Sequence, residues 1–333
     1  MLVKTIENRN NDYKPIWFMR QSGRHLKEYN NLRKKHSDFI SFCLSEKSII
    51  EATLIPVKKY DLDAAIIFSD ILMIPYGLGQ KIEFKKGIGP ILGDLNLDSI
   101  INIDQTSFIK KLLPVYKGIE KVKNNLKEKE LIGFAGAPWT LLLYMLNKGS
   151  PKNSFNFNEI NKDKSLTEIL LKKIEEMVCL HVDKQIEAGA NIIQIFDSWA
   201  GLLPKKELPN YCYIPILKIV EHVKSKKIPV ICFPKGIGEN YLDFCSTAKP
   251  DCISIDYEVD PKWIKEKLKD IPIQGGLDPK ILLGDKEQIK ENTEKYLNIF
   301  KDYPYIFNLG HGVLPEIKPE IIEYVIQIVR SKE

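Results

Sequence analysis

Long hydrophobic segments are missing from this sequence of 333 residues. No apolar run approaches the ~20 residues that a membrane-spanning helix requires. The first residues, 1–8, are mixed and polar instead of forming the apolar core of a signal peptide. Apolar residues make up 44% of the chain and charged residues 28%, which is ordinary for a globular enzyme. We therefore expect a cytoplasmic protein with no membrane partner.

Sequence patterns that bind metals or nucleic acids are also missing. The six cysteines are scattered, with no Cys-x-x-Cys pair, and there is no His-x-x-x-His or carboxylate cluster at ligand spacing. No metal site is therefore predicted, and the cysteines fit reduced, mostly buried thiols. The net charge of +5 is spread over lysines along the whole chain and forms no patch of the kind that binds nucleic acid.

Arginine is scarce. Of the 49 cationic residues only five are arginines, namely Arg9, Arg20, Arg24, Arg33 and Arg330. Because lysine serves almost everywhere else, an arginine indicates a need for its planar guanidinium, which grips a carboxylate with two parallel hydrogen bonds. Arg20 and Arg24 lie four residues apart, directly after the apolar run 16–19. This pair favours a clamp for an anionic substrate; two surface arginines in a loop are the alternative.

Eight short apolar runs are typical of buried strands. They lie at 16–19, 64–68, 131–135, 191–196, 229–233, 252–256, 271–275 and 305–309. Most lack polar alternation, as expected of strands covered on both faces. Helical patterns separate most of them and predict helices over 45–59, 165–188, 207–225 and 315–331, with Ser45 as the N-cap of the first and Ser165 opening the second.

Strands that alternate with helices predict a parallel α/β sheet, and eight of them predict a single-domain (β/α)8 TIM barrel over residues 1–333. An insertion around 75–112 separates the second and third strands, and 81–87 within it suits a small hairpin or loop. A doubly wound open sheet is the alternative, but no G-x-G-x-x-G motif follows the first strand.

Polar and glycine-rich residues follow the predicted strands, where a barrel places its active site. Asp70 follows the second strand and could stabilise a cation or cap a helix. His311 lies between two glycines after the last strand and could donate a proton, contact an anion or merely occupy a turn. Tyr144 could donate to a carboxylate or fill a helix face. Lys235 after the fifth strand leaves open a Schiff-base reaction of the aldolase type.

Five segments together resemble the uroporphyrinogen decarboxylase family. They are Pro15–Arg24 (PIWFMRQSGR), Phe68–Leu72 (FSDIL), Gly133–Thr140 (GFAGAPWT), Gln274–Pro279 (QGGLDP) and Asn308–Gly312 (NLGHG), in the family's order. The similarity extends from about residue 15 to 320. His25, Lys27 and Gln80 depart from the family's usual tyrosine, proline and methionine, and they spare the proposed chemistry.

The resemblance implies a cofactor-free (β/α)8 barrel, commonly a homodimer, that converts uroporphyrinogen III to coproporphyrinogen III in haem and porphyrin biosynthesis. Carried over by motif, Arg20, Gln21 and Arg24 would bind substrate carboxylates. Asp70 would accept hydrogen bonds from the pyrrole N–H groups, and Tyr144, Ser198 and His311 would complete the substrate pocket. The residues expected to act in the reaction are Asp70, Arg20, His311 and Tyr144. Whether His311 or an arginine supplies the proton stays open.

Two other functions compete with this one. A corrinoid methyltransferase of the same superfamily would hold zinc with a His-x-Cys…Cys pattern, but here the stretch Val230-Ile231-Cys232 has valine where the histidine would be. A non-catalytic tetrapyrrole-binding protein would not need the complete set of arginines, Asp70 and His311.

Overall fold

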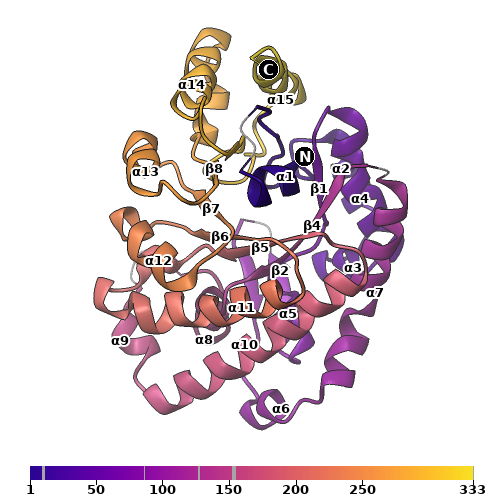
Figure 1. The fold of residues 1–333 in the computed structure, drawn as a ribbon. Helices are drawn as coiled ribbons and strands as arrows, with labels where there is room; N and C mark the ends of the chain where they lie inside the picture. Colours follow the sequence, from indigo (N-terminus) through magenta and orange to yellow (C-terminus); the bar gives the residue numbers. More distant parts are fainter. Residues whose placement is uncertain (10–11, 86, 127, 152–154, 333) are drawn as a thin grey trace.

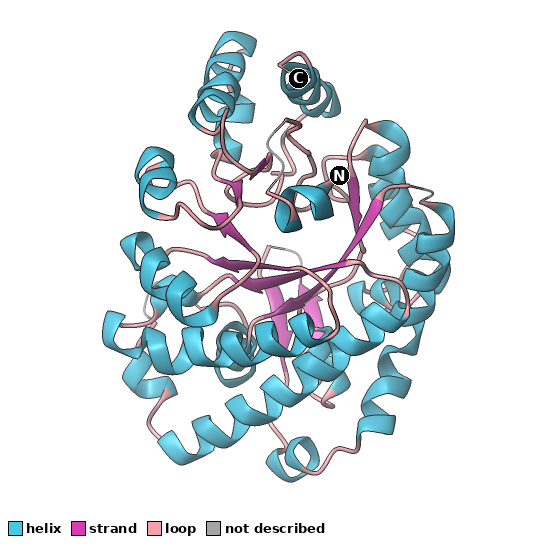
Figure 2. Ribbon diagram, in the orientation of Figure 1, coloured by secondary structure: helices cyan, strands magenta, loops and turns pink. Residues whose placement is uncertain are grey.

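A curled, seven-stranded parallel sheet forms the centre of the protein (Figures 1 and 2). The structure is a computed structural model, and it describes residues 1–9, 12–85, 87–126, 128–151 and 155–332. The strands follow one another in the order β1-β4-β5-β6-β7-β8-β9. Their bounds are β1 Ala64–Ile66, β4 Glu130–Gly136, β5 Ile192–Asp197, β6 Val230–Pro234, β7 Cys252–Ile255, β8 Ile273–Gly275 and β9 Tyr305–Ile306. Seven of the eight predicted strands are therefore confirmed.

The first predicted strand, 16–19, is not a strand in the structure, but it lies between the two edges of the sheet. Ile16 makes one parallel bridge with Phe307, just past β9. Phe307 N–H donates to Pro15 O at 2.7 Å, and on the other side Asp63 N–H donates to Ile16 O at 3.0 Å, just before β1. Segment 15–18 thus bonds to both edges without forming a regular ladder with either.

Helices cover the outside of the sheet (Figure 2). The longer ones are α4 Glu46–Lys59, α7 Gln105–Asn125, α8 Pro138–Asn147, α10 Lys164–Glu187, α11 Ile214–Ser225, α12 Tyr241–Ala248, α14 Lys286–Ile299 and α15 Pro319–Arg330. Shorter ones are α1 Leu2–Glu7, α2 Lys27–Arg33, α3 Phe39–Cys43, α5 Met73–Gly77, α6 Leu97–Ile101, α9 Phe157–Ile160 and α13 Pro261–Lys267. Among the residues described, no helix is long and apolar enough to cross a membrane.

The helix starts follow local capping chemistry. Ser45 caps α4 as predicted, and its side chain accepts a hydrogen bond from Ser48 N–H. The prediction that Ser165 opens α10 is wrong, because the carboxylate of Asp163 accepts from Leu166 N–H and begins the helix two residues earlier. The predicted helix 207–225 is divided, since a π-helical turn over Pro209–Tyr213 precedes α11.

The insertion between β1 and β4 holds short elements. β2 Ile82–Lys85 and β3 Gly89–Leu92 form an antiparallel hairpin, in agreement with the prediction for 81–87. The helices α5 and α6 flank this hairpin in the sequence. Gln80 is buried and donates to Gly93 O at 2.8 Å, so its polar side chain joins the hairpin to the chain that precedes it.

The core has two parts, one between sheet and helices and one enclosed by the sheet. The enclosed part contains Trp17, Met19, Ile66, Ile132, Ile192, Ile231, Phe233 and Ile306, with Phe134 and Phe196 packed against it. A buried polar chain runs through it, in which Trp17 Nε1 donates to Gln274 Oε1 at 2.9 Å and Gln274 Nε2 donates to Gln194 Oε1 and Ser254 Oγ. This chain ties segment 15–18 to β8, β5 and β7.

Candidate active site

Three phenylalanines form an aromatic layer inside the sheet. The rings of Phe134 and Phe196 lie 5.7 Å apart and nearly perpendicular, and those of Phe196 and Phe233 lie 6.3 Å apart in the same arrangement. Phe134 and Phe196 are only half-buried although the residues around them are buried. The layer is therefore the apolar floor of a space that opens toward the carboxyl ends of the strands. The sequence carries this signal, one phenylalanine near the end of each of three consecutive strands, but its role was not predicted.

Side-chain alternation identifies which residues stand above this floor. On β5, Gln194 and Phe196 face inward, whereas Asp197 faces the helices and accepts a hydrogen bond from Thr140 Oγ1 at 2.5 Å. Because side chains alternate along a strand, Ser198 belongs to the inward row. The same count on β6 places Lys235 inward, two residues after Phe233.

Asp70 follows β1 and has one oxygen occupied. Its Oδ1 accepts from Leu72 N–H at 2.8 Å, two residues on. Leu72 is the N-cap of α5 and that helix has no side-chain cap among the described residues, so Asp70 is not the helix cap considered from the sequence. Burial raises the pKa of Asp70 to about 6, while this backbone hydrogen bond and the positive charge of Arg20 act in the opposite direction. The carboxyl group is therefore mostly ionised at neutral pH, and its second oxygen has no hydrogen-bond partner in the described parts of the chain.

Arg20 is held in an unusual backbone conformation beside His311. Its φ of 61° lies in the left-handed region, which few residues other than glycine adopt. A Cβ at Gly312 would lie 2.4 Å from Arg20 Cδ, so the arginine side chain passes directly over this glycine. A Cβ at Gly23 would lie 2.7 Å from Arg20 O, so Gly23 leaves room for the same turn. The two glycines of these motifs therefore set the path of Arg20.

The other residues of the first motif have distinct environments. Gln21 is buried; its Oε1 accepts from Phe18 N–H at 3.1 Å and its Nε2 donates to Ala64 O at 3.1 Å. These bonds join segment 15–18 to β1. Arg24 is exposed on the loop that leads into α2. His25 is buried, and neither ring nitrogen has a hydrogen-bond partner among the residues that the structure describes.

His311 is a neutral imidazole with a defined tautomer. Its Nδ1 accepts from Gly312 N–H at 2.7 Å, which places the proton on Nε2. The pKa of His311 is lowered to about 4, mainly by burial and also by the positive charges of Arg20 and Lys235, whereas Asp256 acts in the opposite direction. The side chain can therefore donate one hydrogen bond from Nε2 at neutral pH.

Tyr144 forms an aromatic wall with Trp199. Their rings lie 6.2 Å apart in an edge-to-face arrangement. Burial raises the pKa of Tyr144, and the charge of Asp70 acts in the same direction while Arg20 opposes it. Thr140 positions the wall, because its hydroxyl accepts from Trp199 N–H at 3.1 Å while donating to Asp197. The positioning role of Thr140 was not predicted from the sequence.

These interactions bring four of the predicted residues together. Electrostatic effects link Arg20 with Asp70, Tyr144 and His311, although the four come from well-separated positions in the chain. Ser198 lies at the same end of the sheet and is half-buried. Arg24 reaches the group less directly, since its charge and that of Asp70 both act on Tyr29. Gln21 is engaged with the backbone.

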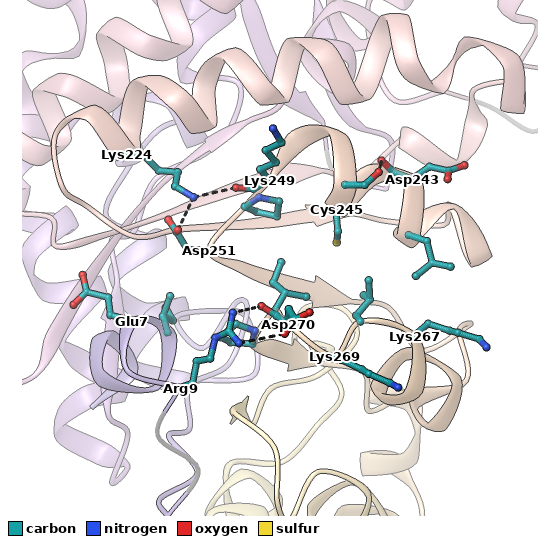
Figure 3. A pocket seen from close by; sticks show the side chains of 17 residues that line it. Glu7, Arg9, Lys224, Asp243, Cys245, Lys249, Asp251, Lys267, Lys269 and Asp270 are labelled. Atoms are coloured by element: carbon teal, nitrogen blue, oxygen red, sulfur yellow. Dashed lines mark hydrogen bonds and ion pairs between the residues drawn. The ribbon is translucent and has the colours of Figure 1, made fainter.

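A cavity of about 770 Å³ lies at the opposite end of the sheet (Figure 3). Its lining comes from the ends of α12 and α13 and from the residues just before β7 and β8. Two ion pairs lie in its lining: Arg9 bonds to Asp270, and Lys224 lies 2.8 Å from Asp251. In a barrel, residues at the amino ends of the strands contribute to stability and not to catalysis. The cavity holds none of the predicted site residues.

Within the described ranges, no group of three or more histidine, cysteine or acidic side chains could hold a metal ion. Cys232, which the zinc-dependent alternative would use, is fully buried, and burial raises the pKa of its thiol well above the ordinary value. A buried neutral thiol is a poor metal ligand.

Comparison with known proteins agrees with the motifs. The family model described as uroporphyrinogen decarboxylase (URO-D) matches residues 1–332. Uroporphyrinogen decarboxylase from Rickettsia bellii (strain RML369-C) is 42% identical, covering 99% of this chain and 97% of that protein. Uroporphyrinogen decarboxylase from Rickettsia africae (strain ESF-5) is 43% identical, covering 97% and 95%.

Solved structures share the fold. A methyltransferase from Methanosarcina mazei superposes with a TM-score of 0.80 at 14% identity, covering 99% of this chain and 97% of that one. A B12-independent methionine synthase from Shewanella sp. W3-18-1 superposes with a TM-score of 0.57 at 9% identity, covering 86% of each chain. At these identities the likeness concerns the fold alone.

Proposed function

The chain belongs to the uroporphyrinogen decarboxylase family, and we propose that it converts uroporphyrinogen III to coproporphyrinogen III in the space above the aromatic layer. The observation that carries this proposal is the convergence of an ionised carboxylate, Asp70, with Arg20, Tyr144 and His311 over an apolar floor. An apolar pocket with a few polar groups is the usual form of a small-molecule site.

The substrate can supply its own electron sink. Protonation of a pyrrole carbon beside an acetate arm makes the ring cationic. The bond to the acetate carboxyl then breaks, its electron pair enters the ring and CO2 leaves. Protonation of the remaining methylene gives a methyl group, and loss of the proton that was first added to the ring carbon restores the neutral pyrrole. The protein must hold the polyanion, stabilise the cation and deliver protons.

Asp70 suits the cation-stabilising role. Its free oxygen can accept hydrogen bonds from pyrrole N–H groups while Leu72 N–H holds the other oxygen in place. A fixed negative charge in a partly dehydrated cleft favours a developing positive charge much more than the same charge would in water.

Arg20 and Arg24 suit the carboxylate-binding role. Arg20 lies beside Asp70 and His311, where an acetate carboxyl would be close to the ring that is being protonated. Arg24 is exposed at the rim and can meet an outer carboxyl. The resemblance implies that Gln21 binds a substrate carboxylate, but this proposal gives it another role. Its hydrogen bonds to Phe18 and Ala64 position the loop that carries the arginines.

His311 suits a hydrogen-bonding role. Its neutral form presents Nε2–H, which can bind a carboxylate oxygen. With its pKa lowered to about 4, the imidazolium form is scarce at neutral pH, which disfavours His311 as the group that delivers the proton. Tyr144 and Ser198 supply hydroxyl groups on the neighbouring walls, and the phenylalanine layer supports the tetrapyrrole.

The proposal includes the form of the whole protein. Segment 15–18 takes the place of the eighth strand in a single barrel domain. Its hydrogen bonds to both edges of the sheet and the continuous core between sheet and helices support this arrangement. The enzyme acts in the cytoplasm as a homodimer, as the family resemblance implies. Light scattering after size-exclusion chromatography should give about twice the mass of one chain, and a monomer mass would contradict the dimer alone.

An anaerobic assay tests the function. The purified protein is incubated with enzymatically generated uroporphyrinogen III without added metal or cofactor, and products are separated by chromatography after oxidation. Stepwise conversion from eight carboxyl groups to four is expected. A folded protein that leaves the substrate unchanged would contradict the proposal.

A further inference from the structure

Lys235 directly follows strand β6 at the carboxyl end of the sheet, and hydrogen bonds fix its backbone on both sides. Its N–H donates to Asp197 O at 3.1 Å, which continues the ladder between β5 and β6. Its carbonyl accepts from Gly201 N–H at 2.9 Å. A Cβ at Gly201 would lie 2.6 Å from Gly236 O, so the two loops touch backbone to backbone. The side chain therefore starts from a rigid point, in the inward row above Phe233.

The ammonium group of Lys235 has no ion pair or hydrogen bond with any part of the chain that the structure describes. Asp256 is a carboxylate that shares its surroundings, since both act on His311. Asp256 is already occupied: its Oδ2 accepts from Gly236 N–H at 2.7 Å and from Tyr241 OH at 3.0 Å, and its Oδ1 accepts from Glu258 N–H at 2.9 Å. Lys235 thus offers an available positive charge beside His311.

The position of β6 in the sheet separates Lys235 from the arginines. In the strand order, β6 stands three places after β1, which carries Asp70, and segment 15–18 lies beyond β1. Arg20 and Lys235 therefore approach the space from different walls. A tetrapyrrole carries carboxylate arms around its whole circumference, so cations on one wall alone would leave the arms on the far side without partners.

We propose that Lys235 binds a carboxylate arm of the tetrapyrrole on a pyrrole other than the one reacting at Asp70. This inference rests on the proposed function. A lysine suits such a contact because its single charged nitrogen on a flexible stem can follow one carboxylate as different pyrroles are presented to Asp70. Since the contact is made equally before and during the reaction, it contributes to substrate binding and not to the chemical step.

Steady-state kinetics of three variants test the inference. Lys235→Met keeps the length of the side chain and removes its charge, and Lys235→Arg keeps the charge. Lys226→Met is the matched control, because Lys226 is exposed before the other end of β6 and lies 3.6 Å from Asp183. We expect Lys235→Met to raise KM for uroporphyrinogen III roughly tenfold with little change in kcat and to weaken the dependence of KM on salt. Lys235→Arg should recover most of the affinity, and Lys226→Met should match the parent.

The outcomes separate this inference from the proposed function. A parent that turns over substrate while folded Lys235→Met keeps the parental KM would overturn the role of Lys235 and leave the function intact. A loss of the same size in Lys235→Met and Lys235→Arg, or a fall in kcat alone, would also overturn it. A parent with no turnover at all would contradict the proposed function and this inference with it.

Discussion

The Arg20 side chain can pass over position 312 because Gly312 has no side chain. Gly312 has a backbone conformation open to other residues, and the three atoms nearest to an added methyl group would all belong to the Arg20 side chain, the first of them 2.4 Å away. We predict that Gly312→Ala raises KM or lowers kcat roughly tenfold with little change in the thermal midpoint, because the flexible arginine moves aside. Arg20→Lys should lose at least as much, since lysine keeps the charge but not the two-pronged grip. Enzyme kinetics and thermal denaturation of the same samples check this.

Gly310 provides a contrast for that experiment. A Cβ there would lie 2.5 Å from Tyr257 N, which is backbone and cannot move aside. Gly310→Ala should therefore lower the thermal midpoint. If Gly312→Ala instead unfolds the protein, or keeps the full activity of the parent, the path assigned to Arg20 is incorrect.

His25 makes stability depend on pH. Burial lowers its pKa from 6.5 to about 4, so between these values the unfolded chain binds a proton that the folded chain does not. Its contribution to the free energy of unfolding therefore decreases as the pH falls from 6.5 toward 4. We predict that His25→Phe, which removes two unpartnered ring nitrogens, stabilises the protein by ~1–2 kcal/mol more at pH 5 than at pH 7.

Urea unfolding of parent and variant at both pH values checks this prediction. The difference between the two proteins is the relevant quantity, because other groups also titrate in this range. His181 and His311 have pKa values lowered by burial in the same way, whereas the raised pKa values of Asp70 and Asp197 act with the opposite sign. An equal change at pH 5 and pH 7 would show that His25 does not titrate as described.

The sequence alone could identify Arg20, Asp70 and His311 as candidate site residues. Scarce arginines, a carboxylate at a strand end and a histidine between glycines are all visible in it. The hydrogen bonds that decide their roles are not visible there. Gln21 lies between Arg20 and Arg24 in the sequence, but its amide bonds to the backbone of Phe18 and Ala64. The tautomer of His311 depends on Gly312 N–H. Such roles depend on the folded backbone.

A buried side-chain hydrogen bond joins segment 15–18 to strand β8. Trp17 Nε1 donates to Gln274 Oε1 at 2.9 Å in the interior of the sheet. We predict that Gln274→Leu lowers the free energy of unfolding by roughly 1–3 kcal/mol, because the indole N–H is left buried without a partner. The double variant Trp17→Phe/Gln274→Leu should cost less than the sum of the two single changes. Denaturant titrations of all four proteins measure this coupling, and strict additivity would show that the bond contributes nothing.

The strands were predictable where most of their residues are buried. Runs such as 131–135 and 191–196 are apolar without alternation, and they became β4 and β5 because helices cover one face and the opposite strands cover the other. Run 16–19 is just as apolar, but its hydrogen bonds are divided between Phe307 and Asp63 and form no regular ladder. The start of α10 was misplaced because Ser165 and Asp163 are both good N-caps, and only the structure shows which one accepts the hydrogen bond.

The two ends of the sheet differ in how their polar side chains are paired. At the carboxyl ends of the strands, Asp70 Oδ2 and the Lys235 ammonium have no partner in the described parts of the chain. At the other end, around the 770 Å³ cavity, charges such as Arg9 and Asp270 satisfy one another. The barrel rule for active sites could predict this division from the sequence. The aromatic layer could not be foreseen as a floor, because only strand pairing places Phe196 opposite Phe233 and Phe134 opposite Gln194, two residues from Phe196.

Replacing one oxygen of Asp70 tests the central claim most directly. Asp70→Asn retains an oxygen that can accept from Leu72 N–H, so the fold should be preserved, but it removes the negative charge near the developing pyrrole cation. The measurement is kcat for the first decarboxylation of uroporphyrinogen III under anaerobic conditions, with the unfolding transition of both proteins recorded alongside. A loss of about 100- to 1,000-fold in a variant that unfolds like the parent is predicted. Near-parental kcat in a folded Asp70→Asn protein would contradict the account.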